Sequence, residues 1–184
     1  LDPVWVAPHP LLSVVLIVVC VWALRVGYGV SPTPVAPGAR WLVVAPFAAS
    51  IVPIALGTVV TGAGPHPRDA ASPRNGGDIE SVARIHALSA WLVVALVVAC
   101  EWLFTRTRQA RPARAARLTL ITVALQGVIG YLQYFLGLPV GIVILHMVGL
   151  TVLTAAVSWL LVSTTRRSHA HQSGPDERAA VRAS

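Results

Sequence analysis

Two histidines, His86 and His146, are the side chains in this sequence with the clearest capacity for chemistry. Each follows the start of a long apolar run by about four to six residues, which places both roughly 6 to 9 Å below the same membrane boundary. An ionisable side chain inside such a segment is costly and marks a functional site by default. Neutral imidazole is a good axial ligand for haem iron, so the pair predicts a haem held between two helices. The alternative for either histidine is a hydrogen bond between helices.

Small and polar residues accompany these histidines at helical spacing. Gly149 follows His146 at i+3, so it shares the face of the helix that carries the imidazole. Gln126, Gly130 and Gln133 form a polar and small stripe at i, i+4 and i+7 on the preceding helix. Buried glutamines usually hydrogen-bond across helices, and the alternative is a contact with the cofactor or with a ligating histidine. We therefore treat Gly149, Gln126 and Gln133 as candidate cofactor-binding residues.

The remaining histidines carry weaker signals. His9 lies between Pro8 and Pro10 at the start of the first apolar run, and His66 lies in a loop rich in glycine and proline. His66 is expected to be exposed, with contact to a haem propionate or a partner as the alternative. No hydrolase, nucleotide-binding or zinc-protease motif occurs in the sequence.

The composition explains how these residues are positioned. Of the 184 residues, 55% are hydrophobic and 11% are charged, and the mean hydropathy is +0.72, which excludes an ordinary soluble domain. Five runs are long enough to span a membrane as helices. They are expected at Val4 to Val30, Trp41 to Thr61, Val82 to Phe104, Leu118 to Leu138 and Val140 to Thr165. The predicted fold is an all-α integral membrane protein of five transmembrane helices, the last four forming a haem-binding four-helix bundle.

The distribution of arginine predicts the orientation in the membrane. All 14 basic residues are arginine, and the net charge is +7, but with so apolar a chain this surplus indicates membrane topology and not nucleic-acid binding. Most arginines fall in the third loop, expected between residues 104 and 118, in the C-terminal tail and beside the first loop. We expect a multi-pass plasma-membrane protein with its N-terminus outside and its C-terminus cytoplasmic. Residues 168–184 are expected to be a disordered tail.

Four stretches of the chain, in order, resemble the C-terminal half of bacterial haem A synthases of the actinobacterial type. They are residues 57–69 (GTVVTGAGPHPRD), 85–87 (IHA), 126–139 (QGVIGYLQYFLGLP) and 145–149 (LHMVG). The resemblance extends from about His9 to Arg167, and it is the combination of motifs that is specific. Haem A synthases are eight-helix membrane oxidoreductases made of two similar four-helix bundles, and they oxidise a ring methyl of haem O to the formyl group of haem A.

The resemblance implies a role for each part of the chain. Residues 31–167 would form the second bundle, with His86 and His146 as the axial ligands of its haem b. Residues 1–30 would be the last helix of the first bundle, in which His9 would match a ligand of the catalytic haem or, alternatively, be an interfacial residue. The chain begins with Leu1, and its only methionine is Met147, so we expect a fragment, a processed product or a non-standard start. The other catalytic residues of the family precede this region.

The function expected from these observations is that of a haem A synthase-type oxidoreductase whose bis-histidine bundle is inactive alone. Haem O is the expected substrate, and haem O synthase, cytochrome oxidase assembly proteins, membrane lipid and a second copy of the chain are the expected partners. Two alternatives remain open. One is a non-catalytic b-type haem protein that transfers electrons, and the other is a haem-free transporter or assembly factor.

Overall fold

The structure is a computed structural model that describes residues 8–63 and 79–166 of the chain. Within these residues it contains five long helices: α2 (Pro8–Gly27), α3 (Pro37–Ala63), α4 (Ile79–Arg106), α5 (Ala110–Phe135) and α6 (Val140–Val162). Each is long and apolar enough to cross a membrane. The prediction of five helices that could span a membrane is confirmed for the described part, which is predominantly helical but also contains two short strands.

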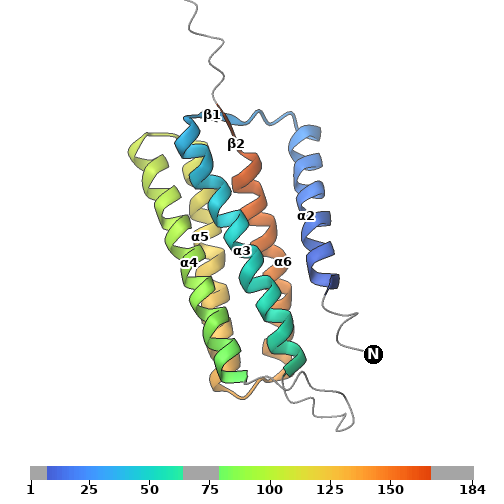
Figure 1. Cartoon of the computed structure of the whole chain (residues 1–184). Coiled ribbons are helices and arrows are strands. Elements are labelled where there is room, and N and C mark those ends of the chain that lie inside the picture. Colours follow the sequence, from blue (N-terminus) through green and yellow to red (C-terminus); the bar gives the residue numbers. More distant parts are fainter. Residues whose placement is uncertain (1–7, 64–78, 167–184) are drawn as a thin grey trace, which may run out of the picture.

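Helices α3 to α6 lie side by side and alternate in direction (Figure 1). Each packs against the next in the chain, and α6 also contacts α3. Helices α4 and α6 therefore lie diagonally opposite each other, separated by α3 and α5. Helix α2 stands outside this group and packs mainly against α6 (Figure 1).

The best-packed region lies toward the end of the molecule where α4 ends and α5 begins. Phe104 and Leu160 are fully buried there, and three alanines of α5, Ala113, Ala115 and Ala116, pack against them. Small residues let helix backbones approach closely, which is the main source of helix association in an apolar solvent. The outward faces carry exposed large apolar side chains, as expected for helices that contact lipid.

Helix α3 contains two prolines, Pro46 and Pro53, and a side chain of α4 fills the gap that Pro46 leaves in the hydrogen-bond ladder. Pro46 has no N–H to donate to the carbonyl of Leu42 one turn earlier. The thiol of Cys100 on α4 donates to that carbonyl instead, with a sulfur-to-oxygen distance of 3.2 Å. This contact joins α3 to α4 at a point where the sequence alone indicates only a buried cysteine.

A short parallel ladder joins the segment before α3 to the segment after α6. Strand β1 (Thr33–Val35) pairs with β2 (Thr164–Arg166), with Thr33 opposite Thr164. The sequence-based extension of the last helix to Thr165 is wrong, because α6 ends at Val162 and the β-branched threonines that follow pair with β1. Arg40 of α3 supports this ending by donating to the carbonyl of Leu161, at 2.6 Å, and to the hydroxyl of Thr164.

The connection between α4 and α5 is also shorter than predicted. Helix α5 begins at Ala110, eight residues before the expected Leu118, so only residues 107–109 separate the two helices. Of the five arginines assigned to this loop, only Arg108 lies between the helices; the others lengthen them, since arginine and alanine are strong helix formers. The His66 loop and the predicted disordered tail, with His169 and His171, lie outside the described residues.

Candidate functional site

The two histidines singled out from the sequence line one large cavity. This cavity has a volume of about 1020 Å³ and lies among α3, α4, α5 and α6, toward the end where α4 begins. His86 enters it from α4, and His146 enters it from the diagonally opposite α6. The remaining lining is mostly apolar. The tertiary structure therefore brings together two imidazoles that lie 60 residues apart in the chain.

His86 is held in one orientation by a backbone carbonyl of α3. Its Nδ1 lies 2.9 Å from the carbonyl oxygen of Pro53. A carbonyl only accepts hydrogen bonds, so this contact requires the proton on Nδ1 and leaves the lone pair on Nε2. An imidazole whose Nδ1–H is bound in this way has the tautomer and the ring orientation of a typical metal-ligating histidine.

His146 is half-buried and lacks such a partner. Its Nδ1 is inaccessible to solvent and has no hydrogen-bond partner among residues 8–63 and 79–166, and the same is true of the side-chain oxygen of Gln133. Both residues line the cavity. Buried polar groups usually have hydrogen-bond partners, so these two atoms are polar groups available to a ligand in an otherwise mostly apolar cavity.

A glycine on the neighbouring helix lies against each imidazole. A Cβ added to Gly57 of α3 would lie 3.5 Å from Cε1 of His86, and one added to Gly130 of α5 would lie 3.4 Å from Cε1 of His146. Larger side chains at either position would meet the rings. The two glycines thus lie next to the histidine rings, where an added Cβ would make ordinary van der Waals contact, and Gly57 was quoted from the sequence without being assigned this position.

Gly149 has a different environment from the one expected. It lies against Gln126, and a Cβ at this position would overlap the side-chain amide of that residue. Gln126 is 8% exposed and lines the cavity, whereas Gly149 is not among the lining residues. Gly149 therefore makes room for a glutamine between α5 and α6 instead of clearing the face of His146.

Aromatic residues of α4 and α5 line the outer part of the cavity, and the sequence analysis did not assign them to the site. Trp91 donates from its indole nitrogen to the hydroxyl of Tyr131 at 3.3 Å, and the ring of Tyr131 stacks on Phe135 with 6.2 Å between centroids. Tyr131 lies inside the QGVIGYLQY motif, which was the available signal. His9, at the start of α2, is exposed and does not line the cavity, although Pro10 beside it does.

The site offers two imidazoles in a mostly apolar cavity, whose lining also includes the ion pair between Glu80 and Arg84. In residues 8–63 and 79–166, no three side chains of the metal-binding types gather into one group. The arrangement is therefore suited to a ligand that needs two axial donors and a large apolar surface around them.

Comparisons with known proteins add no relative to this picture. No family model, no curated protein and no solved structure matches the chain. The likeness to haem A synthases rests on the motifs of the sequence.

Proposed function

We propose that helices α3 to α6 form a four-helix bundle that binds haem b, with His86 and His146 as the two axial ligands of its iron. The observation that carries this proposal is the convergence of two imidazoles from opposite helices on one apolar cavity. A haem supplies four nitrogen donors from its ring, so two histidines complete six-coordinate iron.

The cavity meets three requirements of such a group. Its volume of about 1020 Å³ reaches the upper end of the range of about 300 to 1,000 Å³ that is typical of ligand sites. Gly57 and Gly130 leave space beside the two rings. The Nδ1 of His146 and the side-chain oxygen of Gln133 lack partners among the described residues, and a water held beside the haem would satisfy them, since the iron would bind Nε2.

The residues around the histidines have distinct roles in this proposal. The carbonyl of Pro53 orients His86 and keeps Nε2 available for the metal. Gln126 lines the cavity and fills the space between α5 and α6, and Trp91 and Tyr131 line the cavity and are joined by a hydrogen bond. The bound haem would supply one-electron redox chemistry, and with both axial positions occupied it is suited to electron transfer and not to oxygen activation.

The motifs quoted above support a further assignment to the haem A synthase type, in which a ring methyl of haem O is oxidised to formyl. In this division of labour the bis-histidine bundle carries electrons or stabilises the protein, and the methyl oxidation takes place in the other bundle of the family. A non-catalytic b-type electron carrier is the second candidate, and the lack of an open coordination position at a bis-histidine iron favours it.

The proposed orientation places the histidine cavity near the outer surface of the plasma membrane. The arginines of the described chain support it, because nearly all of them lie at the opposite end, at the ends of α4 and α2 and the start of α3 and α5. Such an arginine-rich end is expected to face the cytoplasm.

The first experiment is a reduced-minus-oxidised absorption spectrum of the detergent-purified chain and of the His86→Ala and His146→Ala variants. We expect a low-spin b-type spectrum in the parent chain that is lost in both variants. His9→Ala is the matched control, since His9 is exposed and lies outside the cavity, and it should keep the spectrum. A colourless parent chain would favour the haem-free transporter or assembly factor, and haem retained in both variants would refute the ligand assignment.

A second experiment tests the proposed division of labour between this bundle and the methyl-oxidising bundle of the family. The chain is expressed alone with haem O, and the extracted haems are analysed. We expect haem O to remain unchanged, because the bis-histidine site offers no position for oxygen. Conversion of haem O to haem A by this chain alone would overturn the proposed division of labour.

A further inference from the structure

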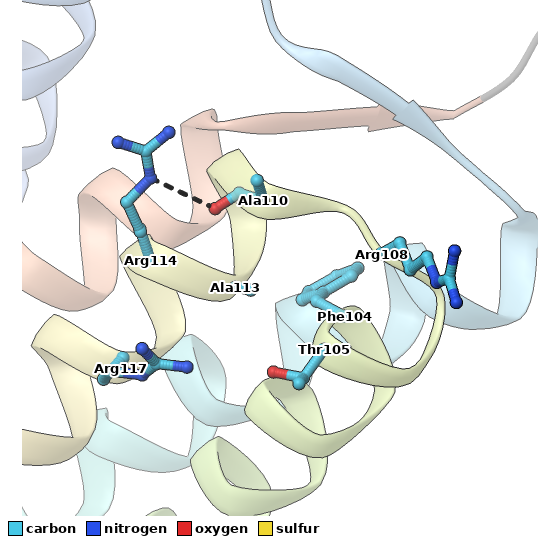
Figure 2. A pocket seen from close by; sticks show the side chains of 7 residues that line it. All are labelled: Phe104, Thr105, Arg108, Ala110, Ala113, Arg114 and Arg117. Atoms are coloured by element: carbon cyan, nitrogen blue, oxygen red, sulfur yellow. Dashed lines mark hydrogen bonds between the residues drawn. The ribbon is translucent and has the colours of Figure 1, made fainter.

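A second cavity lies at the opposite end of the molecule, at the turn between α4 and α5. It has a volume of about 350 Å³ and is lined by Phe104, Thr105, Arg108, Ala110, Ala113, Arg114 and Arg117. Figure 2 shows Arg114 and Arg117 rising from α5 on one side of Phe104 and Arg108 on the other side. The cavity thus combines an apolar floor with arginines on both sides, and the guanidinium groups of Arg108 and Arg114 extend outward from Phe104 in this view.

The positive charge of this cavity is mostly uncompensated. Arg117 pairs with Glu101 of α4, with 2.9 Å between nitrogen and oxygen. Arg108 and Arg114 have no carboxylate partner among the residues that the structure describes, and the one bond of Arg114 is a 3.4 Å contact from Nε to the carbonyl of Ala110 (Figure 2). At the other end of the molecule, by contrast, Arg84 pairs with a glutamate one turn away.

The start of α5 adds to this excess. No acidic residue lies in its first turn, and its N-cap residue Gln109 makes no capping hydrogen bond with its side chain. The start of a helix carries a partial positive charge, so arginines placed there repel it unless an anion is bound. A ligand with negative charge would offset the electrostatic repulsion between the start of the helix and the guanidinium groups.

The position of the cavity indicates what kind of anion it meets. It lies at the ends of two helices that are long enough to cross a membrane. Two tryptophans at this same end, Trp102 and Trp41, each lie beneath an arginine, with 5.1 Å from the guanidinium carbon to the ring centroid. Tryptophan and arginine at helix ends are typical of the level of the lipid headgroups. The arginine fork is suited to bidentate bonds with phosphate oxygens.

We propose that the cavity at the α4–α5 turn binds the phosphate group of an anionic lipid headgroup. Arg108 and Arg114 donate to the phosphate oxygens, and the apolar floor around Phe104 contacts the adjoining glycerol and acyl carbons. The ligand chemistry is that of a phosphate group, and the membrane is its source because the cavity lies at headgroup level. This site is independent of the histidine cavity.

Native mass spectrometry of the full chain in neutral detergent tests the proposal. The chain is titrated with phosphatidylglycerol, with phosphatidylcholine and with inorganic phosphate. We expect one phosphatidylglycerol to bind tightly, and the Arg108→Gln/Arg114→Gln variant to bind it roughly 10- to 30-fold more weakly, since it loses the charge-assisted hydrogen bonds of two arginines to the phosphate.

The matched control is Arg106→Gln/Arg111→Gln, which removes the same charge from the same end but from exposed side chains that do not line the cavity. It should bind phosphatidylglycerol within about threefold of the parent chain, because it keeps the arginines of the cavity. Equal weakening in both double variants would overturn the proposal in favour of a diffuse charged surface. Equal binding of phosphatidylcholine would also overturn it, and so would binding of inorganic phosphate as tight as that of the lipid.

Discussion

The contact between Gly149 and Gln126 makes a sharp prediction for the Gly149→Ala variant. The added Cβ would overlap the side-chain amide of Gln126, which is 8% exposed and held between α5 and α6. The amide must move, because the overlap is with its own atoms, and it must turn toward the histidine cavity that Gln126 lines, away from its packed position between α5 and α6. Extra atoms in a well-packed site cost about 1 to 3 kcal/mol of the free energy of unfolding.

The intrinsic helix preference of alanine acts in the other direction. Replacing glycine by alanine inside a helix stabilises it by about 1 kcal/mol. The Gly127→Ala variant is a control for this helix preference. Gly127 lies on α5, and a Cβ added there would have no neighbouring atom within 4 Å. Gly127→Ala should therefore gain up to about 1 kcal/mol, and Gly149→Ala should be less stable than Gly127→Ala by about 1 to 3 kcal/mol.

Thermal unfolding in detergent, followed by far-ultraviolet ellipticity, measures this difference. For a chain of this size, 1 kcal/mol corresponds to about 2 to 4 °C, so the midpoints should differ by about 2 to 12 °C. The double variant Gly149→Ala/Gln126→Ala removes the overlapping amide and should recover part of the loss that Gly149→Ala causes. Equal midpoints for the two glycine variants, or a double variant no more stable than Gly149→Ala, would refute the contact.

Three further predictions concern contacts at the arginine-rich half of the molecule and can be checked by the same unfolding measurement. Cys100→Ala removes the thiol that donates to the Leu42 carbonyl and leaves a small void, so a loss of about 1 to 2 kcal/mol is expected, and an unchanged midpoint would contradict the bond. Arg40→Met removes the donor to the Leu161 carbonyl at the end of α6 and should cost about 1 to 3 kcal/mol; a neutral effect would show that water replaces it. Arg117→Gln breaks an ion pair at the surface and should cost less than about 1 kcal/mol, with a larger loss indicating a structural role that the exposed geometry does not predict.

The sequence was sufficient to predict the helical segments because two general constraints act on each run separately. An apolar run of about 20 residues can cross a membrane only with its backbone hydrogen bonds satisfied internally, which requires a helix. The matched depth of His86 and His146 follows from counting along the same runs. Their placement in one cavity then follows in large part from the alternation of helix direction.

The ends of the elements were harder to predict from the sequence. Helix α5 begins eight residues before its apolar run, because a helix can extend past the apolar residues that cross the membrane. The end of α6 and the ladder between β1 and β2 depend on two segments that lie about 130 residues apart in the chain. Pairing of this kind leaves no local pattern in either segment.

The neighbours of each site residue were decided by the tertiary structure alone. Helix α6 is apolar on all of its faces, so its sequence does not indicate which residues meet protein and which meet lipid. For this reason the sequence could place Gly149 on the same helix face as His146 but could not show that the side chain of Gln126 packs against Gly149. The same holds for the carbonyl of Pro53, which orients His86: its role depends on which face of α3 is turned toward α4, and only the packed helices determine that.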